Sequence, residues 1–213
     1  MITVKRIDHM GSDADIVAAA RQSTDGAFRG WGTEEKPGDE KLLKYLWEHK
    51  HSTPFEFCSL HVEVSAPIFV ARQVFRHRTF SFSEVSGRYV EIGEDVYAPK
   101  VWRGQGKTNR QGSAEPVAEQ RDAAQAYALG VEAARAVYRH LLSLGVSREQ
   151  ARLVLPVSTM TRWRMAGNLR NWLAFLKLRL APDVQDETRL VAENVAEIVA
   201  ETWPRTWAIA GMA

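Results

Sequence analysis

The segment from residue 56 to residue 77 constrains the fold most, because its hydrophobic pattern changes at a proline from strand-like to helical. Apolar and polar residues alternate in EFCSLHVEVSA (56–66), which predicts a strand with one buried face. Ser65 is then placed to cap a helix through IFVARQVFRH (68–77), and Pro67 lies near the first turn, where its missing N–H costs little. We therefore predict a strand that leads directly into a helix.

The rest of the chain mixes the same two patterns. Further strands are predicted at 2–10 and 157–166, and a short alternating segment at 79–86. Helices are predicted at 14–23 with Asp13 as cap, at 38–50, at 116–144, from the Ser147 and Gln150 capping box, at 168–180, and from Asp183 toward Trp203. Loops are predicted at 28–40 and 103–116. Without an internal repeat or a clear domain boundary, residues 1–213 are predicted to form a single α+β domain.

Charge and cysteine content limit the classes of function. The net charge is only +2, from 28 basic and 26 acidic residues, which argues against a general binder of polyanions. Cys58 is the only cysteine, so no intrachain disulfide can form and a reducing compartment is the simpler expectation. Residues 1–10 lack the apolar run of a signal peptide, and no apolar stretch approaches transmembrane length. We expect a cytoplasmic protein with no membrane partner.

Residues 76–89, RHRTFSFSEVSGRY, concentrate hydrogen-bond donors between two apolar segments. Gln73, Arg76 and His77 share one face of the predicted helix by their spacing. The hydroxyls of the following segment alternate with Phe80 and Phe82, and residues 86–88 are predicted to form a turn in which glycine lets backbone N–H groups approach a ligand. Guanidinium, hydroxyl and backbone donors together suit a phosphate better than a base edge.

Spacing alone leaves three interpretations of this segment open: a pocket for a small anion, a surface loop whose arginines pair with local carboxylates, and a nucleic-acid patch. Aromatic residues that alternate with hydroxyls suggest core rather than a stacking platform, which weakens the third. His51 is a lone loop histidine that can be structural or catalytic, and Cys58 is interpreted as a core residue. Arg152 can be a solvated helix residue and Asn168 a helix cap. No spacing supports a metal site.

The same segment resembles the signature of flavin-dependent thymidylate synthases, an Arg-His-Arg triplet followed by a serine, here Arg76 to Arg78 and Ser86. The resemblance continues in family order through HSTPFEF, APIFVARQVFRHR, ARLVLP and NLRNWLAFLKLR to Gln185 and Glu187. It implies conversion of dUMP to dTMP, with 5,10-methylenetetrahydrofolate as carbon donor and FAD, reduced by NADPH, as the source of reducing equivalents. It also implies a central, mostly antiparallel sheet flanked by long helices, and a homotetramer whose sites are built from several subunits.

Site residues follow from the resemblance position by position. Arg179 matches the arginine that stabilises the deprotonated uracil, and His51 matches a histidine near the flavin; these two are the implied catalytic residues. The implied dUMP-binding residues, with Arg152 donated by another subunit, are Gln73, Val74, Phe75, Arg76, Glu84, Val85, Ser86, Gly87, Arg88, Arg152 and Arg179. The implied FAD-binding residues are Thr53, Arg76, His77, Arg78, Glu84, Asn168, Leu169, Arg170 and Ala174. Ser86 is expected to bind and orient the nucleotide rather than to attack it, and neither a metal nor a nucleic acid is expected.

Four positions depart from the family pattern. Ser83 and Phe57 stand where the family usually has Asn and His, Ala174 stands in place of Asn or His, and Val184 replaces an Ala. Ala174 cannot make the polar flavin contact expected there. Two other functions therefore stay open: a related flavoprotein that methylates another uracil substrate, and a non-catalytic nucleotide- or RNA-binding module.

Overall fold

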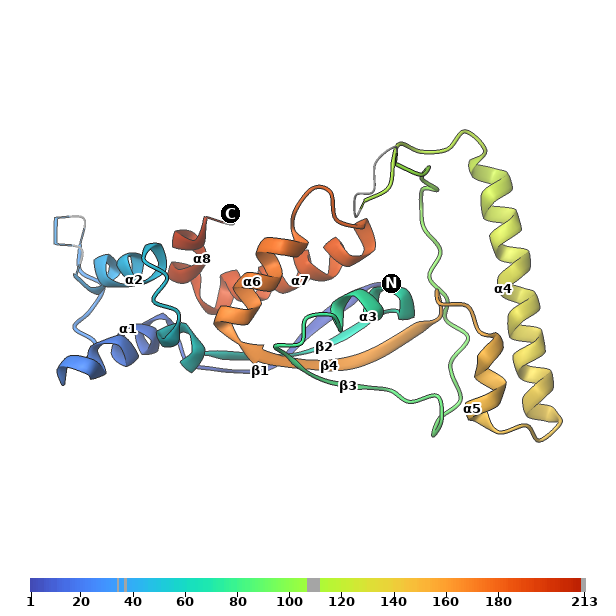
Figure 1. Cartoon of the computed structure of the whole chain (residues 1–213), viewed down its shortest axis with the longest axis horizontal. Helices are drawn as coiled ribbons and strands as arrows, with labels where there is room; N and C mark the ends of the chain where they lie inside the picture. The colour runs from blue at the N-terminus through green and yellow to red at the C-terminus, as the bar shows by residue number, and fades with distance from the viewer. Residues whose placement is uncertain (34, 37, 107–111, 212–213) are drawn as a thin grey trace.

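The computed structural model describes residues 1–33, 35–36, 38–106 and 112–211. Four strands of this described chain form one antiparallel sheet in the order β1-β2-β4-β3 (Figure 1), with the bounds β1 Thr3–Met10, β2 Ser59–Pro67, β3 Ser81–Glu84 and β4 Met160–Asn168. The helices are α1 Asp13–Arg21, α2 Gly38–Glu48, α3 Ile68–Val74, α4 Gln120–Ser143, α5 Arg148–Ala151, α6 Leu169–Arg179, α7 Asp186–Thr202 and α8 Pro204–Ala210, with short 3₁₀ helices η1 Gln22–Thr24, η2 Thr53–Phe57 and η3 Arg152–Val154. The predicted α+β class is confirmed.

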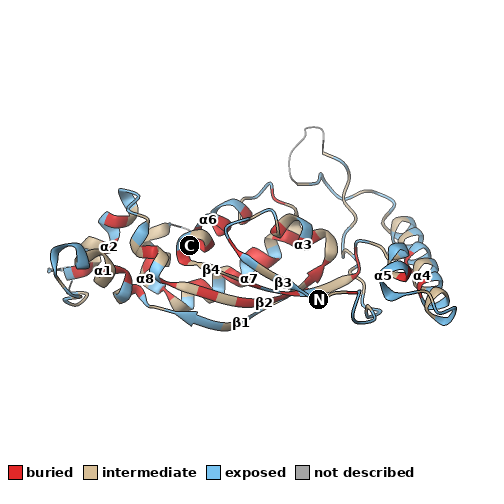
Figure 2. Ribbon diagram, turned by 60° about the horizontal axis from the view of Figure 1, so that its bottom comes forward, coloured by how far each residue is buried: buried red, intermediate tan, exposed pale blue. Residues whose placement is uncertain are grey.

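Helices cover one face of the sheet. Helices α3, α6 and α7 lie on the same side of it in Figure 1, and Figure 2 shows buried residues where they meet the strands. Strand β2 alternates as predicted, since Leu60, Val62 and Val64 are fully buried while the residues between them are half-buried. On the other face, Glu63 pairs in register with Arg164, and their side chains lie 3.7 Å apart as an ion pair. The sheet thus has an apolar face under the helices and a polar outer face.

Tryptophan and phenylalanine side chains fill the space between sheet and helices. Trp163, Trp172 and Trp203 are fully buried and belong to one hydrophobic cluster with residues of α1, α2, α3, α6 and α7. The Trp172 indole N–H donates to the Leu60 carbonyl at 3.1 Å, and the Trp203 indole N–H donates to the Gly11 carbonyl at 3.1 Å. These bonds satisfy the one polar atom of the Trp172 and Trp203 rings, whereas the buried Trp163 indole N–H has no partner within the described residues.

Helix α4 departs from the predicted arrangement. It begins four residues later than the predicted 116–144 and packs against α5 and η3 rather than against the sheet (Figure 1). Within α4, which the structure describes throughout, the buried residues are Val131 and Tyr138. The expectation of a sheet flanked by long helices therefore holds for α6 and α7 and is wrong for α4, the longest helix of the described chain.

Several predicted helix ends are wrong for identifiable reasons. Ser12, not Asp13, is the N-cap of α1, and the Asp15 carboxylate accepts from both its N–H and its hydroxyl. Asp13 is instead buried and accepts from the Thr206 N–H at 3.0 Å and the Thr206 hydroxyl at 2.6 Å, so it caps α8 from a distance. Ser65 lies inside β2, and Pro67 is the N-cap of α3.

In the C-terminal half, one predicted helix cap is confirmed and others are not. The Asn168 side chain accepts from the Asn171 N–H at 3.0 Å, which confirms the predicted cap of α6. Ser147 precedes α5 but makes no side-chain capping bond, and Gln185 rather than Asp183 is the N-cap of α7. Part of the predicted loop at 103–116, residues 107–111, lies outside the described residues. None of the described helices is both long and apolar enough to cross a membrane.

Candidate active site

A tight turn follows β3 and carries the serine of the signature. The Ser86 carbonyl accepts from the Tyr89 N–H at 3.0 Å and the Val90 N–H at 3.2 Å, and the Ser86 hydroxyl accepts from the Arg88 N–H at 3.3 Å. A Cβ at Gly87 would lie 2.6 Å from the Ile92 side chain and 3.2 Å from that of Arg152. A larger residue at this position would therefore force the side chains of Ile92 and Arg152 to move.

A cavity of about 560 Å³ adjoins this turn. Its lining includes Glu84, Val85 and Gly87 from the signature and Arg152 from the start of η3. Glu84 accepts from the Thr161 hydroxyl at 2.7 Å, which fixes the carboxylate at the cavity wall. The resemblance implies that Arg152 comes from another subunit, whereas the structure places it beside Gly87 within one chain.

Arg88 and Arg152 both contact Glu149 of α5. The Arg88 guanidinium lies 3.7 Å from the Glu149 carboxylate and 5.6 Å from the centre of the Tyr89 ring. The Arg152 Nε donates to the Glu149 carbonyl at 3.4 Å. Because the Arg88 side chain is more than half exposed, its ion pair is weak and the guanidinium can exchange it for a bound anion.

A second group of predicted residues surrounds Arg179 at the end of α6. Its Nε donates to His77 Nε2 at 2.9 Å, and its terminal nitrogen reaches the Gln73 carbonyl at 3.5 Å. The Gln73 side-chain amide is held by Gln185 and by the Thr188 hydroxyl, the latter at 3.1 Å. Arg179 is 8% exposed, and burial lowers its pKa. Burial and the neighbouring guanidinium lower the pKa of His77 to about 4, so this histidine is neutral at pH 7.

The helix that carries Gln73 ends sooner than predicted, at Val74, and Arg76 and His77 follow in a turn. Gln73 and His77 both reach Arg179, while Arg76 and Arg78 are exposed. The Val74 side chain is fully buried. Other predicted side chains are also occupied within the fold: Phe75 packs on Trp163 at 5.6 Å, and Leu169 is fully buried with its N–H bound to the Cys58 carbonyl at 2.8 Å.

Three further predicted residues meet at a second cavity, of about 550 Å³, between α2 and α6. His51, Arg170 and Ala174 line it together with Lys177. Arg170 pairs with Glu56, and its side chain remains 55% exposed. Thr53 begins η2 nearby in the chain and is exposed, and Asn168 is used as the cap of α6.

The four departures from the family pattern lie in different environments. Ala174 is exposed at the second cavity, Phe57 is 58% exposed, and Ser83 is exposed on the outer face of the sheet opposite Arg164. Val184 is 2% exposed, so its extra methyl groups relative to alanine are absorbed by packing. Three of the four changes therefore alter an accessible surface, and one alters the interior.

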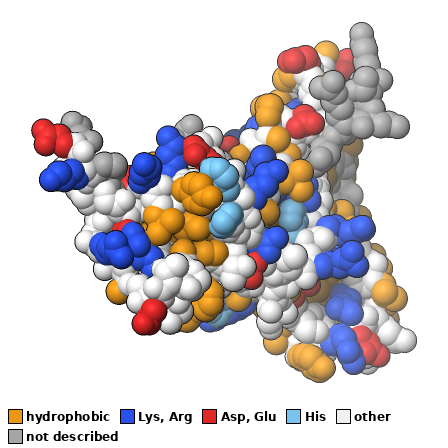
Figure 3. All heavy atoms as spheres, turned by 60° about the vertical axis from the view of Figure 1, so that its left-hand side comes forward, with side chains coloured by type: hydrophobic (Ala, Val, Ile, Leu, Met, Phe, Trp, Pro, Cys, Tyr) orange, Lys and Arg blue, Asp and Glu red, His pale blue; other side chains and the backbone are white. Residues whose placement is uncertain are grey.

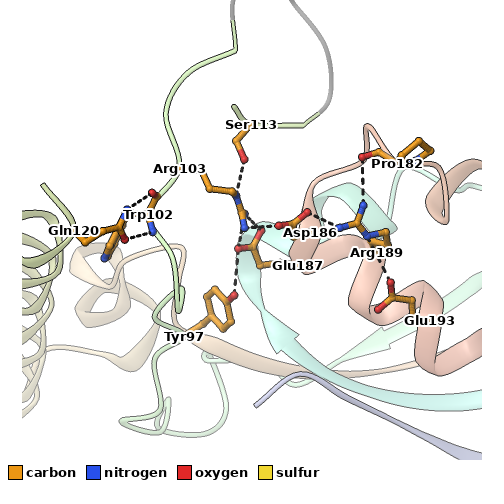
Figure 4. A network of polar contacts seen from close by, with 10 residues as sticks. All are labelled: Tyr97, Trp102, Arg103, Ser113, Gln120, Pro182, Asp186, Glu187, Arg189 and Glu193. Carbon is orange, nitrogen blue, oxygen red and sulfur yellow. Dashed lines mark hydrogen bonds and ion pairs between the residues drawn. The ribbon is translucent and has the colours of Figure 1, made fainter. Parts of the chain in front are cut away.

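Sequence reasoning missed a polar network between the segment after β3 and the first turn of α7 (Figure 4). Arg103 pairs with both Asp186 and Glu187, and the Tyr97 hydroxyl donates to Glu187 at 3.2 Å. Glu187 is 3% exposed, and burial beside this carboxylate raises the pKa of Tyr97 to about 12. The paired acids at 186 and 187 were a visible signal, but their partner lies more than 80 residues away.

Basic side chains lie beside apolar ones on the surface. On the face shown in Figure 3, exposed hydrophobic and histidine side chains lie together, with lysine and arginine side chains around them. Within the described residues no group of three His, Cys, Asp or Glu side chains could hold a metal ion. The available chemistry is that of guanidinium groups, hydroxyls and backbone donors, which suits anionic organic ligands.

In fold, this chain is similar to a nucleotide methylase of known structure. It superimposes on the UMP/dUMP methylase PolB of Streptomyces cacaoi bound with 5-Br dUMP with a TM-score of 0.88 and 34% identity, covering 98% of this chain and 94% of that one. The same methylase bound with 5-Br UMP gives a TM-score of 0.86 and 33% identity, covering 100% and 95% of the two chains.

The family model described as thymidylate synthase complementing protein matches residues 5–205. A flavin-dependent thymidylate synthase of Thermus thermophilus is 45% identical over 205 residues, which cover 96% of this chain and 74% of the relative. That of Thermosipho africanus is 40% identical over 206 residues, covering 96% and 88%, and that of Rickettsia prowazekii is 37% identical over 221 residues, covering 96% and 74%. The chain belongs to the family of flavin-dependent thymidylate synthases, as the signature predicted.

Proposed function

We propose that this chain is an FAD-dependent methyltransferase that converts dUMP to dTMP with 5,10-methylenetetrahydrofolate as carbon donor and NADPH as reductant. The observation that carries the proposal is the cavity beside the Ser86–Arg88 turn, whose lining supplies the guanidinium donors of Arg72, Arg152 and Arg162 in a chain of this family. These donors match the phosphate of a nucleotide in charge and in geometry.

The nucleotide is assigned to the residues around this turn. Arg88 and Arg152 are proposed to bind its phosphate, and Ser86 to orient it. Glu84 and Val85 complete the wall of the cavity. The contribution of Val74 is assigned to its backbone groups, because its side chain is fully buried, whereas Phe75 lines the cavity and is proposed to contact the nucleotide there.

Arg179 is proposed as the catalytic residue that stabilises the deprotonated uracil ring and so raises the nucleophilicity of its C5 atom. A cation acts most strongly on developing negative charge when it is desolvated and held in place, and Arg179 is both buried and fixed by His77 and Gln73. Gln73 and Arg76 are proposed to contact the same nucleotide. His51, at the second cavity, is proposed to act near the flavin.

The residues proposed to hold FAD fit an anionic cofactor. Arg76, Arg78 and Arg170 are exposed guanidinium groups, and Arg170 lines a cavity of about 550 Å³. When bound, FAD supplies the transferred carbon with reducing equivalents taken from NADPH. Ala174 offers no polar atom beyond its backbone at this cavity, and Lys177 on the same wall is proposed to provide the polar contact instead.

UMP is a second candidate substrate. The specific observation in its favour is the similarity to a UMP/dUMP methylase that has been solved with both 5-Br dUMP and 5-Br UMP. The two nucleotides differ at the ribose 2′ position alone, so the same phosphate and uracil contacts serve both. A direct comparison of the two substrates decides between them.

We also propose that residues 1–213 act as one domain and assemble as a homotetramer. Exposed apolar side chains on α4 and after α5 support the assembly: Leu129 is 74% exposed, Leu144 64%, Leu153 80% and Val157 63%. Large apolar side chains grouped on one part of a surface are typical of an interface. A cytoplasmic location stays a prediction from the sequence.

The experiment follows the flavin and the substrate separately. Purified protein reconstituted with FAD is expected to be yellow, to bleach when NADPH is added, and to release tritium from 5-labelled dUMP in the presence of the folate. Release from 5-labelled UMP at an equal or higher rate would favour the second candidate. Protein that cannot bind FAD at all would contradict both and leave a nucleotide-binding module.

A further inference from the structure

We propose that His77 is a positioning residue for Arg179, holding the guanidinium in the orientation in which it acts on the uracil ring. The inference rests on the proposed function, because it concerns the group assigned to activate the substrate. It adds a role to a histidine that the signature connects with the flavin.

The hydrogen bond between the two side chains can run in only one direction. Arg179 Nε carries a hydrogen and cannot lose its charge, so at 2.9 Å it donates and His77 Nε2 must accept. The ring proton of the neutral histidine is thereby confined to Nδ1. A protonated ring would present a second cation to Arg179 and lose the bond.

The histidine ring is itself held from several sides. The Phe175 ring meets it edge-on with centroids 4.9 Å apart, and the Phe80 ring lies 6.5 Å away at a similar angle. The His77 backbone N–H donates to the Val74 carbonyl at 3.0 Å. An imidazole packed in this way presents Nε2 in one direction, which is what a positioning residue requires.

A second point of attachment sets the plane of the guanidinium. The terminal nitrogen of Arg179 reaches the Gln73 carbonyl at 3.5 Å, on the same turn of chain that leads to His77. The Gln73 amide is in turn fixed by Gln185 and Thr188 of the α7 start. Two contacts to one flat group fix both its position and its rotation.

The acceptor of the Arg179 Nε hydrogen bond is a neutral imidazole rather than a carboxylate. Arg170 pairs with Glu56 and Arg103 with Asp186 and Glu187, so in those cases a carboxylate offsets the charge. The imidazole nitrogen that binds Arg179 Nε orients the group without cancelling its charge. Burial strengthens the interaction of such a guanidinium with an anionic uracil.

The test compares two substitutions that differ in whether they keep an acceptor. His77→Phe keeps a flat ring between Phe175 and Phe80 and removes the nitrogen, whereas His77→Gln supplies a side-chain oxygen that can accept from Arg179. We expect His77→Phe to lower kcat for dUMP by about 10- to 100-fold with the FAD-to-protein ratio unchanged. We expect His77→Gln to restore most of this loss. His9→Phe, on the exposed strand β1, is the matched control for replacing a histidine by phenylalanine.

A double-mutant cycle makes the inference independent of any one variant. If His77 acts through Arg179, adding His77→Phe or His77→Gln to Arg179→Ala should cause no further loss of kcat. Additive losses, or equal loss of FAD in both His77 variants, would overturn the inference and leave the histidine as a flavin contact. Wild-type holoenzyme that turns over neither dUMP nor UMP would instead overturn the proposed function, and the inference with it.

Discussion

Arg179 and Arg78, two of the predicted site residues, lie in different environments. Arg179 is 8% exposed and tied to His77 and Gln73, while Arg78 is exposed after the end of α3. This difference supports the proposal that Arg179 acts on the reacting ring and that Arg78 contacts a cofactor at the surface.

Substitution of each arginine by alanine should separate the two roles. Arg179→Ala is expected to reduce turnover far more than FAD retention. Arg78→Ala is expected to loosen FAD, since losing one charged hydrogen bond costs about 1.5–3 kcal/mol, or about one to two decades in affinity. Activity and the absorbance ratio of flavin to protein measure the two effects, and equal loss of both by Arg179→Ala would contradict its assigned role.

The neutral state of His77 makes the stability of the protein depend on pH. Its pKa is about 4 in the folded chain and 6.5 as an ordinary value, so between these the unfolded chain binds the proton more strongly. The stabilisation from neutral His77 is therefore present above the ordinary value and is lost as the pH falls toward the folded value. Thermal melts of wild type and His77→Gln from neutral pH to about pH 5 should show the steeper loss in the wild type. Parallel curves would contradict this assignment.

At the scale of elements, Arg103 connects the segment after β3 to the first turn of α7 (Figure 4). Gln185 and Thr188, at the start of the same helix, hydrogen-bond to Gln73 of the candidate site. The ion pair is therefore connected to the site through the start of α7. Its loss should affect stability first, because Glu187 is 3% exposed.

Arg103→Ala is expected to lower the free energy of unfolding by about 3–5 kcal/mol, the cost of leaving a buried charge without its partner. Arg189→Ala is the matched control, since Arg189 binds Asp186 at 2.8 Å and Glu193 at 3.5 Å in a more exposed position. We expect the control to cost no more than about 1 kcal/mol. Chemical denaturation followed by circular dichroism measures both free energies of unfolding. Similar losses would argue against a special contribution of the buried ion pair between Arg103 and Glu187.

Local patterns predicted the elements whose determinants are themselves local. The alternation of Leu60, Val62 and Val64 predicted β2, and the side chain of Asn168 predicted the start of α6. Asp13 and Asp183 also have the residue type of a cap, but Asp13 is used by the distant α8 and Asp183 is displaced by Gln185. A cap depends on which backbone donors a carboxylate meets in space, and spacing along the chain does not contain that information.

The contacts of the candidate site were also not predictable from spacing along the chain. The resemblance implied one nucleotide site for Glu84, Gly87 and an Arg152 donated by another subunit, whereas within this single chain all three line one cavity. The resemblance carried this prediction, because spacing alone left the segment undecided. The bond between Gln73 and Gln185 joins residues 112 apart in the chain, and no periodicity can reveal such a pair.

At the scale of the whole molecule, α4 and α5 lie at one end, apart from the sheet (Figure 1). The exposed apolar side chains on α4 and after α5 are the basis of the proposed assembly. In one chain, the residues around Gly87 and those around Arg179 form separate groups. Assembly is the proposed way in which the two groups meet one nucleotide.

Charged substitutions on this surface should weaken assembly and activity together. Leu129→Glu and Leu153→Glu replace side chains that are 74% and 80% exposed in the single chain, so folding should be little affected. Gln125→Glu, on an exposed position of α4, controls for the added charge. Sedimentation velocity should show dissociation of the two leucine variants alone. Wild-type protein that is monomeric and active would contradict the proposed tetramer.

The central claim is tested most directly by the product that purified protein forms from dUMP. The reaction contains FAD, NADPH and 5,10-methylenetetrahydrofolate, and chromatography with mass detection identifies the nucleotide. We predict dTMP in excess over the protein, with formation lost when FAD, NADPH or the folate is omitted. Protein that binds both FAD and dUMP yet forms no dTMP would contradict the account.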